Sequence, residues 1–289
     1  MENITNLLGD YSFSNIEDRM EFDLNGVVEK ESKKVYLAEN LKFCVSCIDY
    51  TTLRESDTLG SVTFFVEDLL KKLKKEDLRN VASVCVFPNF APIVRQALSG
   101  HDIKTTVVAG GFPASQTFIE LKLSECKMAI EAGAEEIDVV LSVGDILEKN
   151  YQKVYNELSA IRSVCKNVRL KVILETGELK SIENIFNASL IAMYAGADFI
   201  KTSTGKVPVN ATPEAVYIMC NAIKQFKEKT GKTVGIKVAG GVAKAHNALR
   251  YLVIVNYVLG ERWVSSDYFR IGSSKLLEDI IKELKNTKE

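Results

Sequence analysis

Two lysines fall in short apolar segments that are typical of neighbouring buried strands, FIKTSTG (199–205) and TVGIKVAG (233–240). Lys201 and Lys237 have inward side-chain parity, so both are expected to point into one interior. Two ammonium groups in a partly dry cavity disfavour each other's charge, and lowering a lysine pKa by about 3 units requires about 4 kcal/mol. A neutral amine attacks carbonyls to form an imine, so we predict that Lys201 is a Schiff-base nucleophile. One such lysine alone could equally be a strand-end side chain reaching solvent, but the pair favours function.

A carboxylate is predicted to face the same interior. Asp138 lies in EIDVVLS (136–142), on the parity opposite to its apolar neighbours. Imine chemistry needs proton transfer at the carbinolamine and at the carbon that loses its partner, and an inward carboxylate could relay those protons through a water. The alternative is a structural ion pair. For Lys171 and Glu175, on the next strand candidate RLKVILET (169–176), an ion pair and a direct role both stay open.

Glycine-rich turns follow three of the strand candidates: Gly205-Lys206, Gly240-Gly241 and Gly272-Ser273-Ser274. Glycine lets backbone N–H groups approach a phosphate, and the amino end of a helix favours an anion. One glycine pair usually marks only a turn. Three of them at consecutive strand ends predict a phosphorylated substrate.

The elements that must position these residues alternate along the chain. Eight apolar segments are predicted strands, at 44–50, 82–88, 103–110, 136–142, 169–176, 199–205, 233–240 and 269–274. Amphipathic segments between them predict helices, including 115–132, 151–166, 180–196 and 213–229, the last opened by Thr212-Pro213-Glu214. The alternation allows a barrel or an open doubly wound sheet. The count of eight and the inward polar residues favour a (β/α)8 TIM barrel with its site at the strand carboxyl ends.

Residues 1–40 fall outside this alternation. They are polar and charged, with a capping-box candidate at Ser14 and Glu17. We predict a helical extension over 1–40 that packs on a barrel formed by 41–289.

Composition excludes several classes of protein. The 289 residues carry a net charge of −1, so no basic field favours nucleic acid or an anionic membrane. No secretory signal and no apolar run of about 18 residues is evident, so we expect no membrane span and a cytoplasmic location. Six cysteines are then expected to be reduced thiols.

Metal and Ser-His-Asp chemistry are poorly supported. Only His101 and His246 occur, whereas zinc enzymes usually need two or three histidine ligands. Cys44 and Cys47 have the spacing of a metal or redox pair, but in a strand residues three apart face opposite sides. We expect buried thiols, and neither a metal nor a cofactor.

Seven segments together resemble the class I deoxyribose-phosphate aldolases. DFIKTSTGKVPVNATPE (198–214) is similar to the family's Schiff-base segment, GIKVAGGV (235–242) to its second-lysine segment and GAEEIDVV (133–140) to its aspartate segment. CIDYTTLRESDT (47–58), SVCVFPNF (83–90), LKVILETGEL (170–179) and RIGSS (270–274) are also similar to it. The similarity runs from about residue 41 to about residue 280.

The resemblance implies a role for each matching residue. Lys201 would form the Schiff base, Lys237 would lower its pKa, and Asp138 would transfer protons with Lys237. The substrate pocket would include Asp49 and Cys85. The phosphate would be bound at Gly205, Lys206, Gly240, Gly241, Ser273 and Ser274. The implied reaction is the reversible cleavage of 2-deoxy-D-ribose 5-phosphate to acetaldehyde and D-glyceraldehyde 3-phosphate, without a cofactor.

Some positions depart from that family's pattern. Ala243 stands where bacterial members often have arginine, which puts the phosphate contact in doubt unless Lys244 or Lys206 compensates. The chain ends Lys-Asn-Thr-Lys-Glu and lacks the terminal tyrosine that assists some members. Two alternatives stay open: another imine-forming lyase on a different phosphorylated sugar, and a catalytically silent barrel that acts as a binding protein. Barrels of this class are often dimers, but no segment identifies an interface.

Overall fold

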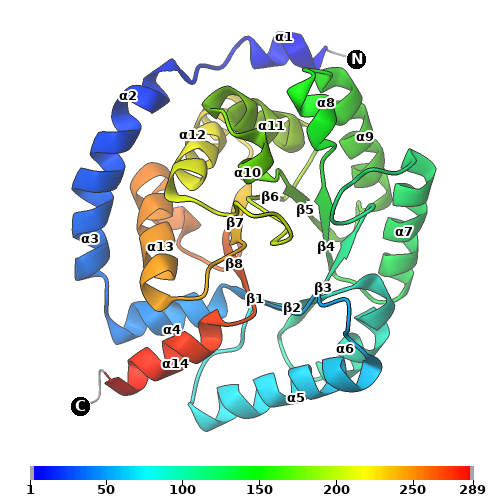
Figure 1. Cartoon of the computed structure of the whole chain (residues 1–289), viewed down its shortest axis with the longest axis vertical. Helices are drawn as coiled ribbons and strands as arrows, with labels where there is room; N and C mark the ends of the chain where they lie inside the picture. Colours follow the sequence, from blue (N-terminus) through cyan, green and yellow to red (C-terminus); the bar gives the residue numbers. More distant parts are fainter. Residues whose placement is uncertain (1–2, 287–289) are drawn as a thin grey trace.

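Eight parallel strands close into a barrel in the computed structural model, which describes residues 3–286 (Figure 1). The strands pair in chain order, each with the next, and β8 returns to β1. Their bounds are β1 Ile48–Thr51, β2 Ser83–Val86, β3 Lys104–Ala109, β4 Glu136–Val140, β5 Arg169–Ile173, β6 Phe199–Lys201, β7 Gly235–Ala239 and β8 Phe269–Ser273. The predicted (β/α)8 barrel is confirmed, and the open doubly wound sheet is excluded.

Helices connect the strands and form the outer layer. They are α5 Leu59–Lys75, α6 Ala91–Ala97, α7 Ile119–Glu131, α8 Val143–Leu147, α9 Tyr151–Val164, α10 Thr176–Leu179, α11 Ile182–Tyr194, α12 Pro213–Thr230, α13 Ala245–Leu259 and α14 Leu276–Asn286. The predicted start of α12 is confirmed: the Thr212 side chain accepts a hydrogen bond from the backbone N–H of Ala215 at 3.1 Å. No helix of the described residues is long and apolar enough to cross a membrane.

Strand register brings the inward side chains together. Lys201 of β6 and Lys237 of β7 are direct Cα partners, as are Asp138 of β4 and Lys171 of β5. The opposite parity of these strands is apolar and packs under the outer helices. The barrel interior is therefore unusually rich in charge, although every strand of it is buried.

The N-terminal segment lies along the outside of the barrel (Figure 1). It comprises α1 Ile4–Leu8, α2 Ser14–Phe22, a π-helical stretch Asp23–Val28, α3 Glu29–Lys34 and α4 Ala38–Ser46. Between them, α1, α2 and α3 contact α9, α11, α12 and α13. The proposed boundary between residues 40 and 41 falls inside α4.

Two local predictions in the first 50 residues are wrong. Ser14 is not a helix cap: α2 is preceded by Phe13, and the Ser14 hydroxyl hydrogen-bonds the Ser12 hydroxyl at 2.9 Å. The strand predicted from residue 44 begins only at Ile48, because Cys44 lies in α4. Cys44 packs inward with Leu41 and Val45 at helical spacing.

Both cysteines of the Cys-x-x-Cys pair are fully buried and unbonded. Burial raises the pKa of Cys44 well above its ordinary value, which keeps it a thiol. Among residues 3–286, no group of three or more histidines, cysteines or carboxylates is placed to hold a metal ion.

Candidate active site

Lys201 stands at the carboxyl end of β6, where the barrel interior opens into a cavity. Its side chain is 4% exposed, and its Nζ donates to Asp138 Oδ2 at 2.8 Å. Among the described residues this carboxylate is its one ion-pair partner. Lys201 lines the cavity, so a ligand there would meet its amine.

Lys237 lies beside Lys201 but is held more firmly. Its Nζ contacts Asp138 Oδ2 at 2.7 Å and Asp49 Oδ2 at 2.5 Å, and it has no exposed surface. The glycine at position 272 leaves space for the Lys237 side chain. A Cβ atom at this position would lie 3.1 Å from Lys237 Cε and 2.8 Å from Ala239 Cβ. One carboxylate oxygen of Asp138 therefore receives both ammonium groups.

The two lysines have opposite pKa shifts. Burial lowers the pKa of Lys201 below its ordinary value, and neighbouring Lys237 adds to that effect while Asp138 opposes it. Burial would also lower the pKa of Lys237, but Asp138 and Asp49 outweigh it and hold that pKa above its ordinary value. Lys201 is the better candidate for a neutral amine, and burial contributes more to this than the second lysine does.

The cavity above Lys201 has a volume of about 400 Å³. Its wall includes the three glycine-rich turns, through Gly205, Lys206, Gly240, Gly241, Gly272, Ser273 and Ser274. Gly240 has φ +89°, and a Cβ there would lie 2.4 Å from the Asn210 side chain. Glycine at this position lets the turn lie against the 207–212 loop.

The serine turn leads into α14 at the cavity wall. Ser273 Oγ accepts from the backbone N–H groups of Lys275 and Leu276 at 3.2 and 3.1 Å, and donates to the Val242 carbonyl oxygen at 2.6 Å. This hydroxyl caps α14 and ties β8 to the turn after β7. Ser274 and Lys275 complete the wall at the amino end of α14, a position that favours an anion.

Besides Lys201, three basic side chains line the same cavity: Arg54, Lys206 and Lys275. Lys206 Nζ donates to the Leu53 carbonyl oxygen at 2.7 Å and to Glu55 Oε1 at 2.9 Å. Lys244, considered as a substitute for the arginine missing at Ala243, is instead paired with Asp279 at 2.8 Å. Arg54 and Lys275 were not predicted from the sequence. Arg54 lies in a segment that resembles the family, 47–58, and Lys275 directly follows another, 270–274.

Asp138, Asp49 and Cys85 do not line the cavity and are completely buried in the barrel interior. Asp138 accepts from Lys171 at Oδ1, 2.9 Å, and from the two other lysines at Oδ2. Burial would raise the pKa of Asp138, but Lys171, Lys201 and Lys237 outweigh it and hold that pKa well below its usual range. Burial raises the pKa of the Cys85 thiol.

Lys171 and Glu175, whose roles the sequence left undecided, have different partners in the structure. Lys171 contacts Glu136 at 2.7 Å, Asp138 at 2.9 Å and Asp49 at 3.5 Å. Glu175 instead accepts from the backbone N–H and the hydroxyl of Thr204. The suggested ion pair between Lys171 and Glu175 is therefore wrong.

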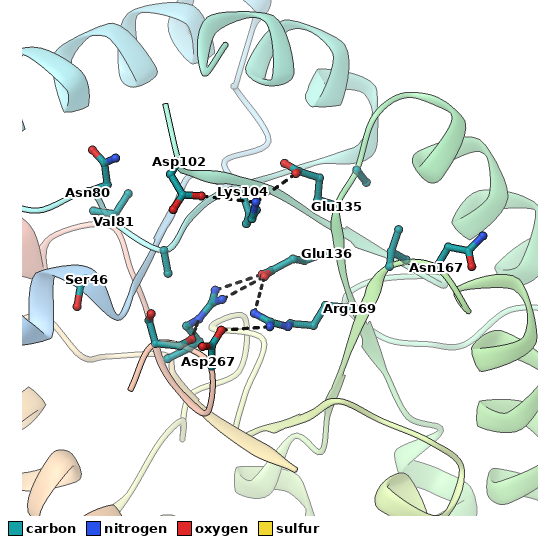
Figure 2. Close-up of a pocket in the computed structure, with 15 residues that line it drawn as sticks. Ser46, Asn80, Val81, Asp102, Lys104, Glu135, Glu136, Asn167, Arg169 and Asp267 are labelled. Atoms are coloured by element: carbon teal, nitrogen blue, oxygen red, sulfur yellow. Dashed lines mark hydrogen bonds and ion pairs between the residues drawn. The ribbon is translucent and has the colours of Figure 1, made fainter. Parts of the chain in front are cut away.

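A second and larger cavity, of about 620 Å³, lies at the amino-terminal end of the barrel. It is lined by residues before or at the start of the strands, among them Lys104, Glu136, Arg169, Asp267 and Arg270. Figure 2 shows Glu136 and Arg169 pointing toward each other across it, their side chains 3.1 Å apart. Each of its three cations, Lys104, Arg169 and Arg270, has a carboxylate partner.

Comparison with known proteins assigns the chain to a family. Residues 43–255 match the model of the DeoC/LacD family aldolases. The chain belongs to this family. The deoxyribose-phosphate aldolase of Bos taurus is 43% identical over 263 residues, 87% of this chain and 83% of that protein. The human enzyme of the same name is 41% identical over the same coverage.

The fold of this DeoC/LacD family aldolase is similar to solved structures as well. The tetrameric deoxyribose phosphate aldolase from Aeropyrum pernix superposes with a TM-score of 0.68 at 25% identity, over 92% of this chain and 98% of that one. A structure named "QR15, an Aldolase" superposes with a TM-score of 0.68 at 26% identity, over 85% of this chain and 97% of that one. The chain is thus an aldolase, and the silent-barrel alternative has no support.

Proposed function

We propose that this chain is a class I aldolase that reversibly cleaves 2-deoxy-D-ribose 5-phosphate into acetaldehyde and D-glyceraldehyde 3-phosphate, with Lys201 as the Schiff-base nucleophile. The single observation that carries the proposal is the position of Lys201, a buried lysine with a lowered pKa that lines a cavity walled by glycine turns. The names of the bovine and human relatives support the same substrate.

The proposed reaction begins at the aldehyde carbon of the open-chain sugar. The neutral Lys201 amine adds to it, and the carbinolamine takes up a proton and loses water to give a protonated imine. Removal of the proton from the hydroxyl on C3 lets the C2–C3 bond break, which releases D-glyceraldehyde 3-phosphate. The electron pair remains as an enamine, which takes a proton at C2 and is hydrolysed to acetaldehyde and free Lys201.

Asp138 and Lys237 are the proposed proton carriers. Asp138 lies within hydrogen-bond distance of both lysines and is kept ionised by them at rest, so it takes up the proton that Lys201 gives up only transiently and passes it on through a water. Lys237 stays protonated between two carboxylates and supplies positive charge without competing as a nucleophile. Asp49 and Cys85 are proposed to shape the interior next to the substrate.

The phosphate is proposed to bind at the turns after β6, β7 and β8. Gly205, Lys206, Gly240, Gly241, Ser273 and Ser274 offer backbone N–H groups and one ammonium at this wall. Arg54 and Lys275 add positive charge that offsets the missing arginine at Ala243. The location is proposed to be the cytoplasm and the assembly a homo-oligomer, a dimer being the simplest.

Borohydride trapping tests the imine. Incubation with 2-deoxy-D-ribose 5-phosphate and sodium borohydride is expected to give one covalent adduct, which peptide mass mapping places on Lys201. Because a lowered pKa means more neutral amine, trapping should rise with pH and reach its half-maximum below the ordinary lysine value near 10.4. Lys201→Met is the matched control and should give no adduct. An adduct on another lysine would contradict the assignment.

A ketose phosphate profile would favour the remaining alternative, an imine-forming lyase on a different sugar. The two are separated by comparing cleavage of 2-deoxy-D-ribose 5-phosphate with that of ketose phosphates under one condition. The proposal requires the deoxysugar phosphate to have the larger kcat/KM.

A further inference from the structure

Arg270 enters the barrel interior from the end opposite to the proposed substrate. It lies on β8 and lines the amino-terminal cavity, and its side chain is 4% exposed. Its Nη1 donates to Asp49 Oδ1 at 2.8 Å, and Nη1 and Nη2 donate to the two oxygens of Glu136 at 3.2 and 3.1 Å. A guanidinium with this fork geometry fixes carboxylates in orientation as well as in charge.

Arg270 is connected to Lys201 through direct contacts. Asp49, held by Arg270 at Oδ1, contacts Lys237 through Oδ2 at 2.5 Å. Lys237 in turn shares Asp138 Oδ2 with Lys201. An unbroken series of ion pairs therefore runs from one cavity to the other through the barrel.

The buried part of this network does not balance in charge. Among residues 3–286 it contains four cations, Lys171, Lys201, Lys237 and Arg270, and three carboxylates, Asp49, Glu136 and Asp138. Three of the cations have two or three carboxylate partners each, whereas Lys201 has one that it shares. The positive excess therefore falls on Lys201.

Other strands and loops also place side chains against this network. Besides the seven residues of the network, Cys85 of β2 and Glu175 after β5 act on Lys201, and burial raises the pKa of both. β3 supplies the Thr106 hydroxyl, which contacts Glu136 and Lys171, and the partly exposed Lys104, which pairs with Glu135. Arg169 of β5 contacts Glu136 but is 31% exposed at the cavity.

We propose that Arg270 is a positioning residue for Lys201. By holding Asp49 and Glu136 from the amino-terminal end, Arg270 supplies the positive excess that leaves Lys201 without a carboxylate of its own. The inference rests on the proposed Schiff-base role of Lys201. It assigns a function in the reaction to the end of the barrel that the substrate does not reach.

Substitutions that remove opposite charges from the network should shift the pH at which Lys201 loses its proton in opposite directions. Arg270→Gln removes one positive charge, so Lys201 is balanced by the carboxylates and stays protonated to higher pH. The low-pH limb of the borohydride trapping rate should then move up by at most about one pH unit, the lower limit for a charge in direct contact, because Arg270 acts through Asp49 and Lys237. Glu136→Gln removes one negative charge, and the same limb should move down.

Arg270→Lys separates charge from geometry. It keeps the charge but loses the fork, so the limb should stay within about 0.3 pH unit of the parent while the plateau rate falls. Arg95→Gln, which removes an exposed arginine paired with Glu135, is the control for an unrelated loss of charge and should leave the limb in place. Circular dichroism and thermal melts establish that each variant is folded.

The outcomes are distinguishable. A parent enzyme that gives no adduct on Lys201 contradicts the proposed function itself, before Arg270 is tested. The positioning role is overturned if the parent enzyme gives an adduct on Lys201 but Arg270→Gln and Glu136→Gln have the same low-pH limb of the trapping rate as the parent. The same holds if both variants shift the limb in one direction, since that would reflect a general loss of structure. If Arg270→Gln does not fold, the downward shift of Glu136→Gln decides alone.

Discussion

The barrel has a cavity at each end, and the smaller one is the proposed active site. At the amino-terminal end, a cavity of about 620 Å³ is lined by two arginines and one lysine that each have a carboxylate partner. At the carboxyl end, about 400 Å³ are lined by three glycine turns and by Lys201, which shares its one carboxylate. Volume does not distinguish the two ends. The carboxyl end differs because a lysine without a carboxylate of its own lies there next to glycine turns whose backbone a ligand can approach.

The two ends also differ in how the chain reaches them. The carboxyl-end cavity lies where strands pass into turns, which can vary without disturbing the barrel. The amino-terminal residues sit at strand starts, and their ion pairs cross between neighbouring strands, as Glu136 and Arg169 do. The proposed role of Arg270 qualifies this contrast, because it would make one residue of the structural end act on the reactive end.

Lys237→Leu should have the largest effect of the substitutions that probe the contrast. Loss of its charge leaves the Oδ2 oxygen of Asp138 to Lys201 alone, so the pKa of Lys201 rises and less neutral amine is present at pH 7. We expect kcat to fall by about 100-fold or more, the size typical of a lost acid–base group. Steady-state kinetics with circular dichroism measure it. Near-normal turnover at neutral pH would contradict the charge argument.

Lys206→Met should have an intermediate effect, on binding. Lys206 lines the carboxyl-end cavity and its partner Glu55 is largely exposed, so its ammonium is available to a phosphate. Loss of about 1.4 kcal/mol would raise KM for 2-deoxy-D-ribose 5-phosphate about tenfold. Unphosphorylated 2-deoxy-D-ribose is the matched control, and its slow cleavage should be unchanged. An equal loss with both sugars would show that Lys206 does not bind the phosphate.

Lys104→Met should have the smallest effect, at the amino-terminal end. Lys104 is half-exposed and its two carboxylates lie at 3.6 and 3.7 Å, the type of surface pair that contributes about 1 kcal/mol or less. Aldolase activity should stay within about twofold of the parent, and the free energy of unfolding within about 0.5 kcal/mol. Activity assays and urea unfolding measure both. A large loss of activity would place this end among the reactive parts of the barrel.

The barrel was predictable because its sequence signals are periodic. Alternating parity on either side of Lys201, Asp138 and Lys237 gave their inward direction, and register then placed the two lysines side by side. The start of β1 was not predictable in this way. A short apolar run such as that around Cys44 fits a helix or a strand equally well, and here it forms a helix that packs against α13 and α14.

The ionic network was only partly visible in the sequence. Glu136 lies two residues before Asp138 on β4 and therefore faces the same side of the strand, and Arg270 is the first residue of RIGSS. Their inward direction could therefore have been predicted from the alternation of side chains along the strands. Their partners could not be predicted, because Arg270 meets Asp49 221 residues away and Glu136 134 residues away. Only closure of the barrel between β8 and β1 brings them together.

The N-terminal segment has a consequence for the order in which the protein is assembled. Asp23 accepts from the Tyr217 hydroxyl at 2.5 Å and from the Tyr257 hydroxyl at 3.0 Å, partners 194 and 234 residues later in the chain. The stretch around Asp23 therefore cannot make these contacts until α12 and α13 have been synthesised, whereas α1 contacts α9 and α11, which are made earlier. The apolar face of this stretch therefore stays exposed to chaperones or to other nascent chains during most of translation. Its docking would be among the last steps of folding.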